Sequence, residues 1–99
     1  MSETTGQTQN ELNKLLKFLD ENGIKYELDG SEILIKGRLT YVYPAGDYTN
    51  YEVKQGKKTI FYNMRGGFQS LTINRKRQII LYDSFAFYNY PYFIIVVRK

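Results

Sequence analysis

From residue 23 onward, the apolar residues of this 99-residue chain recur at every second position, and this change of period constrains the fold most. Before that point, four leucines recur with the spacing of one helix face: Leu12, Leu15, Leu16 and Leu19. Thr8 and Glu11 fit a capping box, and Asn22-Gly23 supplies a C-terminal stop. We therefore expect one amphipathic helix over about residues 9–22, after a polar, disordered tail at 1–7. Residues 8–99 should form a single domain.

The remainder of the chain carries strand and turn signals only. Asp29-Gly30, placed between two alternating runs, is a strong hairpin signal because such turns need positive φ. Further alternating runs follow at about 39–43, 51–54, 59–63, 68–73 and 78–82. The run Tyr92–Val97 is apolar on both faces, so it should lie centrally in the sheet or at a subunit interface. The sequence thus predicts an α+β fold, in which one N-terminal amphipathic helix packs on a meandering antiparallel sheet of six to eight strands. A single helix leaves one face of this sheet poorly covered, so we expect either that the sheet curls into a partial barrel or that a second copy of the chain covers that face.

Composition excludes several classes of chemistry. The chain has no Cys and no His, which removes disulfides, thiolate catalysis, structural zinc and histidine acid–base catalysis. Its start lacks the apolar run of a signal peptide, and its longest apolar stretch is far shorter than the about 20 residues that span a bilayer. We expect a cytoplasmic protein, or a virion component if viral, with no cofactor, no metal site and no membrane partner.

Charge is distributed unevenly along the chain. Residues 1–33 carry seven acids against three lysines, whereas residues 34–99 carry eleven Lys and Arg against three acids. The two parts therefore have net charges of −4 and +8, which together give the formal net charge of +4. An anionic partner for the basic, strand-rich part is the functional interpretation, and ordinary solubilising charge is the alternative.

Candidate phosphate contacts are the cations on expected turns and strand ends. The strongest group is Arg75, Lys76 and Arg77 on one turn, because phosphate contacts confer affinity without sequence preference. The alternative is that these charges keep strand edges from pairing with other chains. The full candidate set for nucleic-acid binding is Lys36, Arg38, Lys57, Lys58, Arg65, Arg75, Lys76 and Arg77.

Aromatic residues are dense near the C-terminus, with six rings between Phe85 and Phe93. The chain also has ten tyrosines, and exposed rings among Lys and Arg are what single-strand binders use for base stacking. The same rings are favoured anchors of protein interfaces, and the C-terminal segment has few polar companions, which favours an interface or the core there. The candidate partner-interface residues are Phe85, Phe87, Tyr88, Tyr90 and Tyr92.

Only one segment resembles a catalytic motif. Glu52-Val53-Lys54 is similar to the E-x-K half of the metal site in restriction-endonuclease-like proteins. Asp47 is too close to Glu52 for the spacing in that family, and the helix expected after the motif is missing from the sequence pattern. We therefore expect no enzymatic activity and no catalytic residues.

Two functions remain open from the sequence. The first is a small non-enzymatic protein that binds DNA or RNA through a basic, tyrosine-bearing sheet surface. The alternative is a protein-interaction module of viral or mobile-element type, which forms a homodimer or inhibits a host protein partner through the aromatic C-terminal segment. A dimer would double the basic surface, so the two functions are compatible.

Overall fold

The computed structural model describes the backbone of residues 3–45, 48–65, 68–82, 84–89 and 91–97, and most side chains from residue 10 onward. Within these ranges the single helix is α1 (Glu3–Glu21). It ends as predicted: Gly23 has φ +69, and the amide of Ile24 donates to the carbonyl of Leu19 at 2.9 Å. It begins earlier than expected, so Thr8 and Glu11 lie inside the helix and do not cap it.

Nine strands follow α1 in the described part of the chain. They are β1 (Tyr26–Asp29), β2 (Glu32–Lys36), β3 (Arg38–Ala45), β4 (Tyr48–Gln55), β5 (Lys58–Arg65), β6 (Phe68–Ile73), β7 (Arg77–Tyr82), β8 (Ser84–Asn89) and β9 (Tyr92–Val97). All pairs are antiparallel, and the strands form a four-stranded sheet of order β1-β2-β9-β8 and a five-stranded sheet of order β3-β4-β5-β6-β7. Strand β9 lies between β2 and β8, which confirms its predicted central place.

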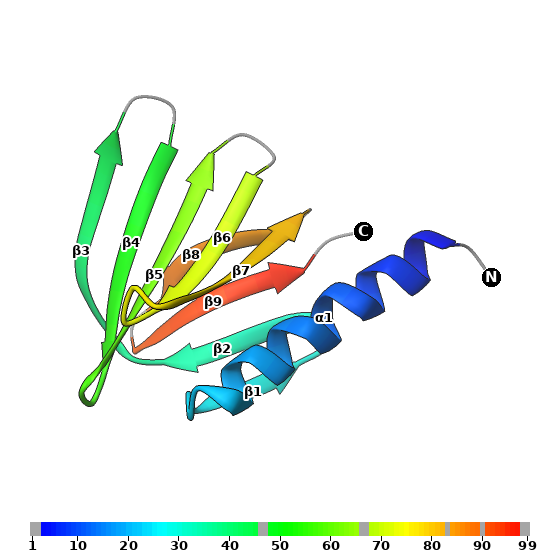
Figure 1. Ribbon diagram of the computed structural model, residues 1–99, viewed down its shortest axis with the longest axis horizontal. Coiled ribbons are helices and arrows are strands. Elements are labelled where there is room, and N and C mark those ends of the chain that lie inside the picture. Colours follow the sequence, from blue (N-terminus) through cyan, green and yellow to red (C-terminus); the bar gives the residue numbers. More distant parts are fainter. Residues whose placement is uncertain (1–2, 46–47, 66–67, 83, 90, 98–99) are drawn as a thin grey trace.

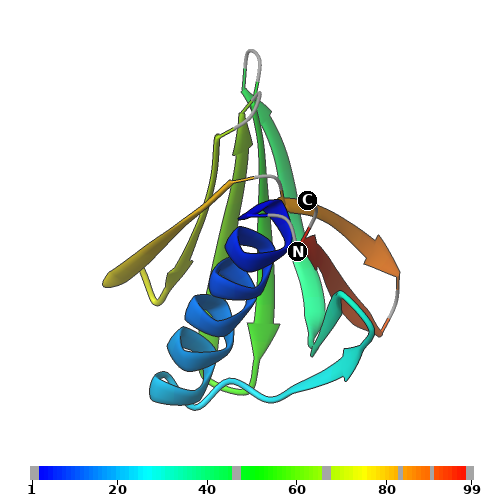
Figure 2. The ribbon, with the colours of Figure 1, turned by 90° about the vertical axis from the view of Figure 1, so that its right-hand side faces the viewer.

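The two sheets and the helix enclose one core. In Figure 1, the five-stranded sheet rises on one side, while β1, β2 and β9 run beneath it and α1 crosses in front. Figure 2 shows α1 in the opening between β7 and the four-stranded sheet, and α1 contacts both β7 and β9. No strand pairing joins the two sheets among the residues described, so they do not close into a barrel.

The core consists of the inner faces of both sheets and one side of α1. Side chains that are almost inaccessible to solvent come from all three layers and include Leu15, Leu19, Ile33, Ile35, Val53, Ile60, Tyr62, Leu71, Leu81, Phe93 and Ile95. Their alternation along each strand is that of a half-buried sheet. The opposite face of the five-stranded sheet is consequently left without a covering layer.

A chain of three hydrogen-bonded polar side chains lies within this core. The hydroxyl of Tyr62 lies 3.0 Å from that of Ser84, which in turn donates to the side-chain carbonyl of Gln69 at 3.3 Å. Because Ser84 has a single hydroxyl proton, Tyr62 is the donor to Ser84. Burial is the main cause that raises the pKa of Tyr62 from 10.0 to about 12. The hydroxyl of Ser84, which can donate to the tyrosinate, lowers the pKa by a smaller amount, and the nearby Tyr51 raises it slightly.

The fold class is confirmed as a small α+β domain, but two details of the prediction are wrong. The described residues form nine strands rather than six to eight, and these strands form two sheets rather than one meander. The additional strand is β8, whose rings Phe85 and Phe87 point away from the core while the small Ala86 points in. In a typical half-buried strand the large apolar side chains point toward the core, whereas in β8 they point outward. The two-sheet division depends on pairing between β2 and β9, which are far apart in sequence.

The predicted first hairpin is confirmed, with its turn shifted by one residue. Asp29 pairs with Glu32 within the ladder, so the two loop residues are Gly30 and Ser31. Gly30 has φ +64. A positive φ at the first loop position is what a type II′ turn requires, and glycine adopts it without steric cost.

Candidate functional site

The outer face of the five-stranded sheet carries a broad hollow. Figure 2 shows α1 and the four-stranded sheet on the opposite side of the five-stranded sheet, so neither covers this face. The volume of the hollow is about 670 Å³, and its lining is contributed by all five strands and the β6–β7 turn. The lining includes Tyr41, Tyr43, Asn50, Glu52, Phe61, Asn63 and Arg75.

A β-bulge in β3 places two tyrosines on this face. The register shifts between Leu39 and Tyr41, which leaves Thr40 as an extra residue, and the Thr40 hydroxyl donates to the carbonyl of Glu52 at 2.9 Å. Leu39 therefore packs against the core, whereas Tyr41 and Tyr43 lie on the outer face. The sequence pattern had placed all three on one face, because a regular strand has a period of two. No simple sequence signal marks this bulge.

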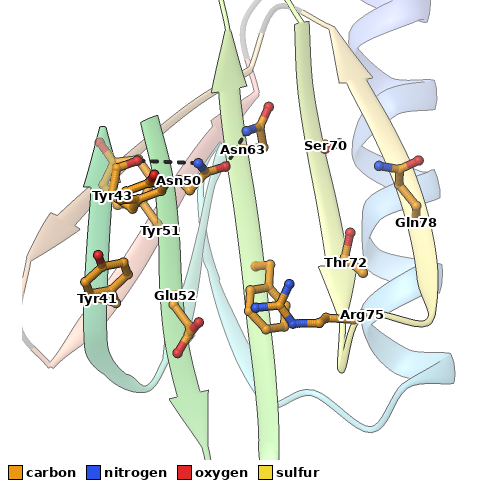
Figure 3. A pocket seen from close by; sticks show the side chains of 11 residues that line it. Tyr41, Tyr43, Asn50, Tyr51, Glu52, Asn63, Ser70, Thr72, Arg75 and Gln78 are labelled. Carbon is orange, nitrogen blue, oxygen red and sulfur yellow. Dashed lines mark hydrogen bonds between the residues drawn. The ribbon is translucent and has the colours of Figure 1, made fainter. Parts of the chain in front are cut away.

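Tyr41 and Tyr43 form an exposed aromatic pair. Their ring centroids are 5.8 Å apart, their planes differ by 18°, and the residues are 54% and 50% exposed. Beside them, the Asn63 amide donates to the side-chain oxygen of Asn50, whose own amide donates to the backbone carbonyl of Tyr43 at 3.4 Å (Figure 3). The rings thus stand next to a row of oriented amides, which supply hydrogen-bond donors and acceptors.

Arg75 extends over the same face from the β6–β7 turn. Its guanidinium carbon lies 4.1 Å from the centre of the Phe61 ring, within the range of a cation–π interaction. The turn is held by Asn74, which exchanges two hydrogen bonds with the backbone of Thr59, each of 2.8 Å. Asn74 and Arg75 have φ values of 53 and 59, an uncommon conformation for residues other than glycine. The turn therefore directs one cation onto the aromatic face.

The other two cations of this turn do not join Arg75 at the hollow. Lys76 is exposed at the tip of the turn. Arg77 faces α1, where its Nη2 atom lies 2.7 Å from Oε1 of Glu21 and its guanidinium lies 5.8 Å from the Phe18 ring centre. The predicted basic triplet is therefore divided among the sheet face, the solvent and the helix.

The remaining predicted cations lie in three places. Lys36 and Arg38 line a separate hollow at the junction of the sheets. Lys57 is exposed on the β4–β5 turn, and Lys58 lies against the C-terminal end of α1, where a Cβ built on Gly23 would be 3.5 Å from its Nζ. The side chain of Arg65 lies outside the described residues.

The aromatic C-terminal segment is divided between the two faces of the four-stranded sheet. Phe85 and Phe87 lie on its outer face, with ring centroids 5.8 Å apart, and Phe85 is 38% exposed. Tyr88 is exposed on the side of the sheet that carries Phe93, its partner in β9. Tyr92 is half-buried, and Tyr90 lies outside the described residues.

Comparisons with models of protein families, with curated proteins and with solved structures give no match to this chain. Within the part of the chain that the structure describes, no group of three or more Asp and Glu side chains is positioned to hold a metal ion. The helix α1 is too polar to qualify as a membrane span, and the described residues contain no other helix.

Proposed function

We propose that this protein binds single-stranded nucleic acid on the outer face of the five-stranded sheet. The observation that carries this proposal is the exposed, nearly parallel pair of Tyr41 and Tyr43 on the same open face as Arg75. The face combines rings for stacking, amides for hydrogen bonding and one cation in one hollow, which the carboxylate of Glu52 also lines.

The chemistry of the face favours single strands over duplexes. Bases in a duplex are stacked on one another, whereas unpaired bases are free to stack on aromatic side chains. Such stacking contributes about 1–3 kcal/mol per base and tolerates any sequence, because every base has a π face. The net charge of +8 on residues 34–99 supports attraction to phosphates, which weakens with salt.

The test is a fluorescence anisotropy titration with labelled single-stranded and double-stranded oligonucleotides at two salt concentrations. We expect single strands to bind more tightly and the double substitution Tyr41→Ala with Tyr43→Ala to weaken them about tenfold to a hundredfold. Tyr88→Ala is the matched control, since it removes an exposed ring from the other sheet. Non-specific binding of nucleic acid has a Kd of about 10⁻⁴–10⁻⁶ M at physiological salt. A Kd for single strands that is weaker than this range would reject the proposal.

A second candidate function is self-association through β8. This strand is an edge of the four-stranded sheet, and it presents the exposed Phe85 next to Phe87. An edge strand with exposed apolar residues is a ready template for pairing with a second copy of the chain. Self-association through this strand predicts a melting temperature that rises with protein concentration in the wild type and not in Phe85→Ser. A concentration-independent melting temperature in the wild type would exclude it.

A further inference from the structure

Three cations gather in a second hollow, where the two sheets join. Lys36 ends β2, Arg38 begins β3 and Lys54 lies on β4, and together they line an open hollow of about 450 Å³. All three residues are exposed. None has an Asp or Glu oxygen within ion-pair distance among the residues that the structure describes. Lys54 was not among the cations singled out from the sequence.

The backbone around these cations is held firmly in place. Gly37 presses directly on β4: a Cβ at this position would lie 2.7 Å from Cγ1 of Val53 and 3.0 Å from the carbonyl oxygen of Lys54. The amide of Gly37 also donates to the carbonyl of Pro91 at 3.1 Å. A side chain at residue 37 would thus push this part of the chain away from β4, so the glycine lets the end of β2, with Lys36, lie close to β4.

Hydrogen bonds from the side chain of Gln55 also hold the junction of the two sheets together. Its side-chain amide donates to the carbonyl of Lys36 at 2.6 Å and to that of Lys25 at 2.9 Å, and its side-chain oxygen accepts from the amide of Lys25 at 2.8 Å. The side chain of Gln55 therefore spans β4 and both ends of the β1–β2 hairpin. These contacts fix the backbone that carries Lys36.

The arrangement carries an electrostatic cost that a bound anion would remove. Arg38 and Lys54 are direct partners in the β3–β4 ladder, so their side chains leave the same face of the sheet. Like charges in directly opposed positions destabilise a sheet. A phosphoryl group offers several acceptor oxygens and the opposite charge, and Arg and Lys are its preferred ligands.

We propose that the hollow formed by Lys36, Arg38 and Lys54 binds a phosphoryl group. The inference stands on residues other than the tyrosine face and does not rest on the proposed function. The phosphoryl group comes either from the backbone of a nucleic-acid strand or from a free phosphate compound such as a nucleotide. Both sources present the same chemistry to the three cations.

The test is isothermal titration calorimetry of the whole protein with pyrophosphate. We expect saturable binding to the wild type, weakened about tenfold in Arg38→Gln and in Lys54→Gln, since each removes one charged hydrogen bond. Lys17→Gln, which removes one exposed charge from α1, is the matched control and should bind as the wild type does. Without pyrophosphate, the melting temperature of Lys54→Gln should be no lower than that of the wild type, because a repulsive pair is lost.

Two results would overturn this inference. One is the absence of saturable pyrophosphate binding to the wild type. The other is an equal loss of affinity in Lys17→Gln and Lys54→Gln, which would indicate general attraction to a basic protein. Pyrophosphate binding should persist in the double variant Tyr41→Ala with Tyr43→Ala, so a failure of the tyrosine face is distinguishable from a failure of this hollow.

A competition experiment separates the two sources. If a saturating single-stranded oligonucleotide lowers the apparent affinity for pyrophosphate, the hollow takes a backbone phosphate of the strand. If pyrophosphate binds equally well with and without the oligonucleotide, the hollow takes a free phosphate compound.

Discussion

The buried hydroxyl of Tyr62 should make the protein sensitive to alkaline pH. Its pKa is about 12 in the folded protein, chiefly because burial disfavours the tyrosinate, against an ordinary value of 10.0. The folded state therefore holds this proton more tightly than the unfolded state. The sign follows from linkage: the stabilisation is complete below pH 10 and is lost as pH rises through the window from 10 to 12.

The size of this loss follows from the pKa difference. Two pKa units correspond to about 2.7 kcal/mol in the free energy of unfolding at pH values above the window, and to about half of that midway through it. Tyr62→Phe removes the titrating group and the hydrogen bond to Ser84, so it should cost about 0.5–1.5 kcal/mol at neutral pH. Its free energy of unfolding should then fall less steeply than that of the wild type between pH 10 and 12.

Urea unfolding curves at neutral pH and at several pH values across the window measure both effects. Tyr41→Phe is the matched control, since it makes the same chemical change on an exposed ring and should retain the loss seen in the wild type. If the wild type and Tyr62→Phe lost stability in parallel between pH 10 and 12, the reasoning about this buried hydroxyl would be refuted.

Three further substitutions test the packing of the fold. Gly37→Ala should lower the free energy of unfolding by about 1–3 kcal/mol in urea, because the new methyl group overlaps the fully buried Val53. An unchanged urea midpoint would contradict the close approach of Gly37 to β4. Asn74→Ala should lower the free energy of unfolding by about 1–3 kcal/mol in the same measurement, because it loses the hydrogen bond from the Thr59 amide and keeps the strained φ. Asn74→Gly should lower it by less, because glycine adopts this φ without strain. Arg77→Gln should lower stability by about 0.2–1 kcal/mol at low salt and by less at high salt, as for a solvent-exposed ion pair with α1; a larger loss that salt does not reduce would contradict this.

Local features of the fold could be predicted from the sequence. The helix follows from the leucine spacing and from Gly23, and the first hairpin follows from Gly30, because each signal lies within a few consecutive residues. The central place of β9 was also predictable, since a strand that is apolar on both faces needs cover on both. The strand β8 was missed because its rings point outward and its small residues point inward.

The candidate sites depend on pairings that the local pattern does not contain. Tyr41 and Tyr43 reach the outer face only because Thr40 is a bulge, which is defined by its pairing with β4. Arg75 and Arg77 differ in environment because one lies over Phe61 and the other meets α1. The sequence therefore predicted a basic, tyrosine-bearing sheet in general terms, while the particular residues of its face depend on register.

The central claim is that the outer face of the five-stranded sheet binds a single strand. Backbone amide chemical-shift mapping by NMR, with a labelled protein and a short single-stranded oligonucleotide, tests it most directly. The account predicts shifts concentrated at Tyr41, Tyr43, Asn50 and Arg75, with little change at Phe85 and Phe87 on the other sheet. Shifts confined to β8 and β9, or no shifts at low salt, would contradict it.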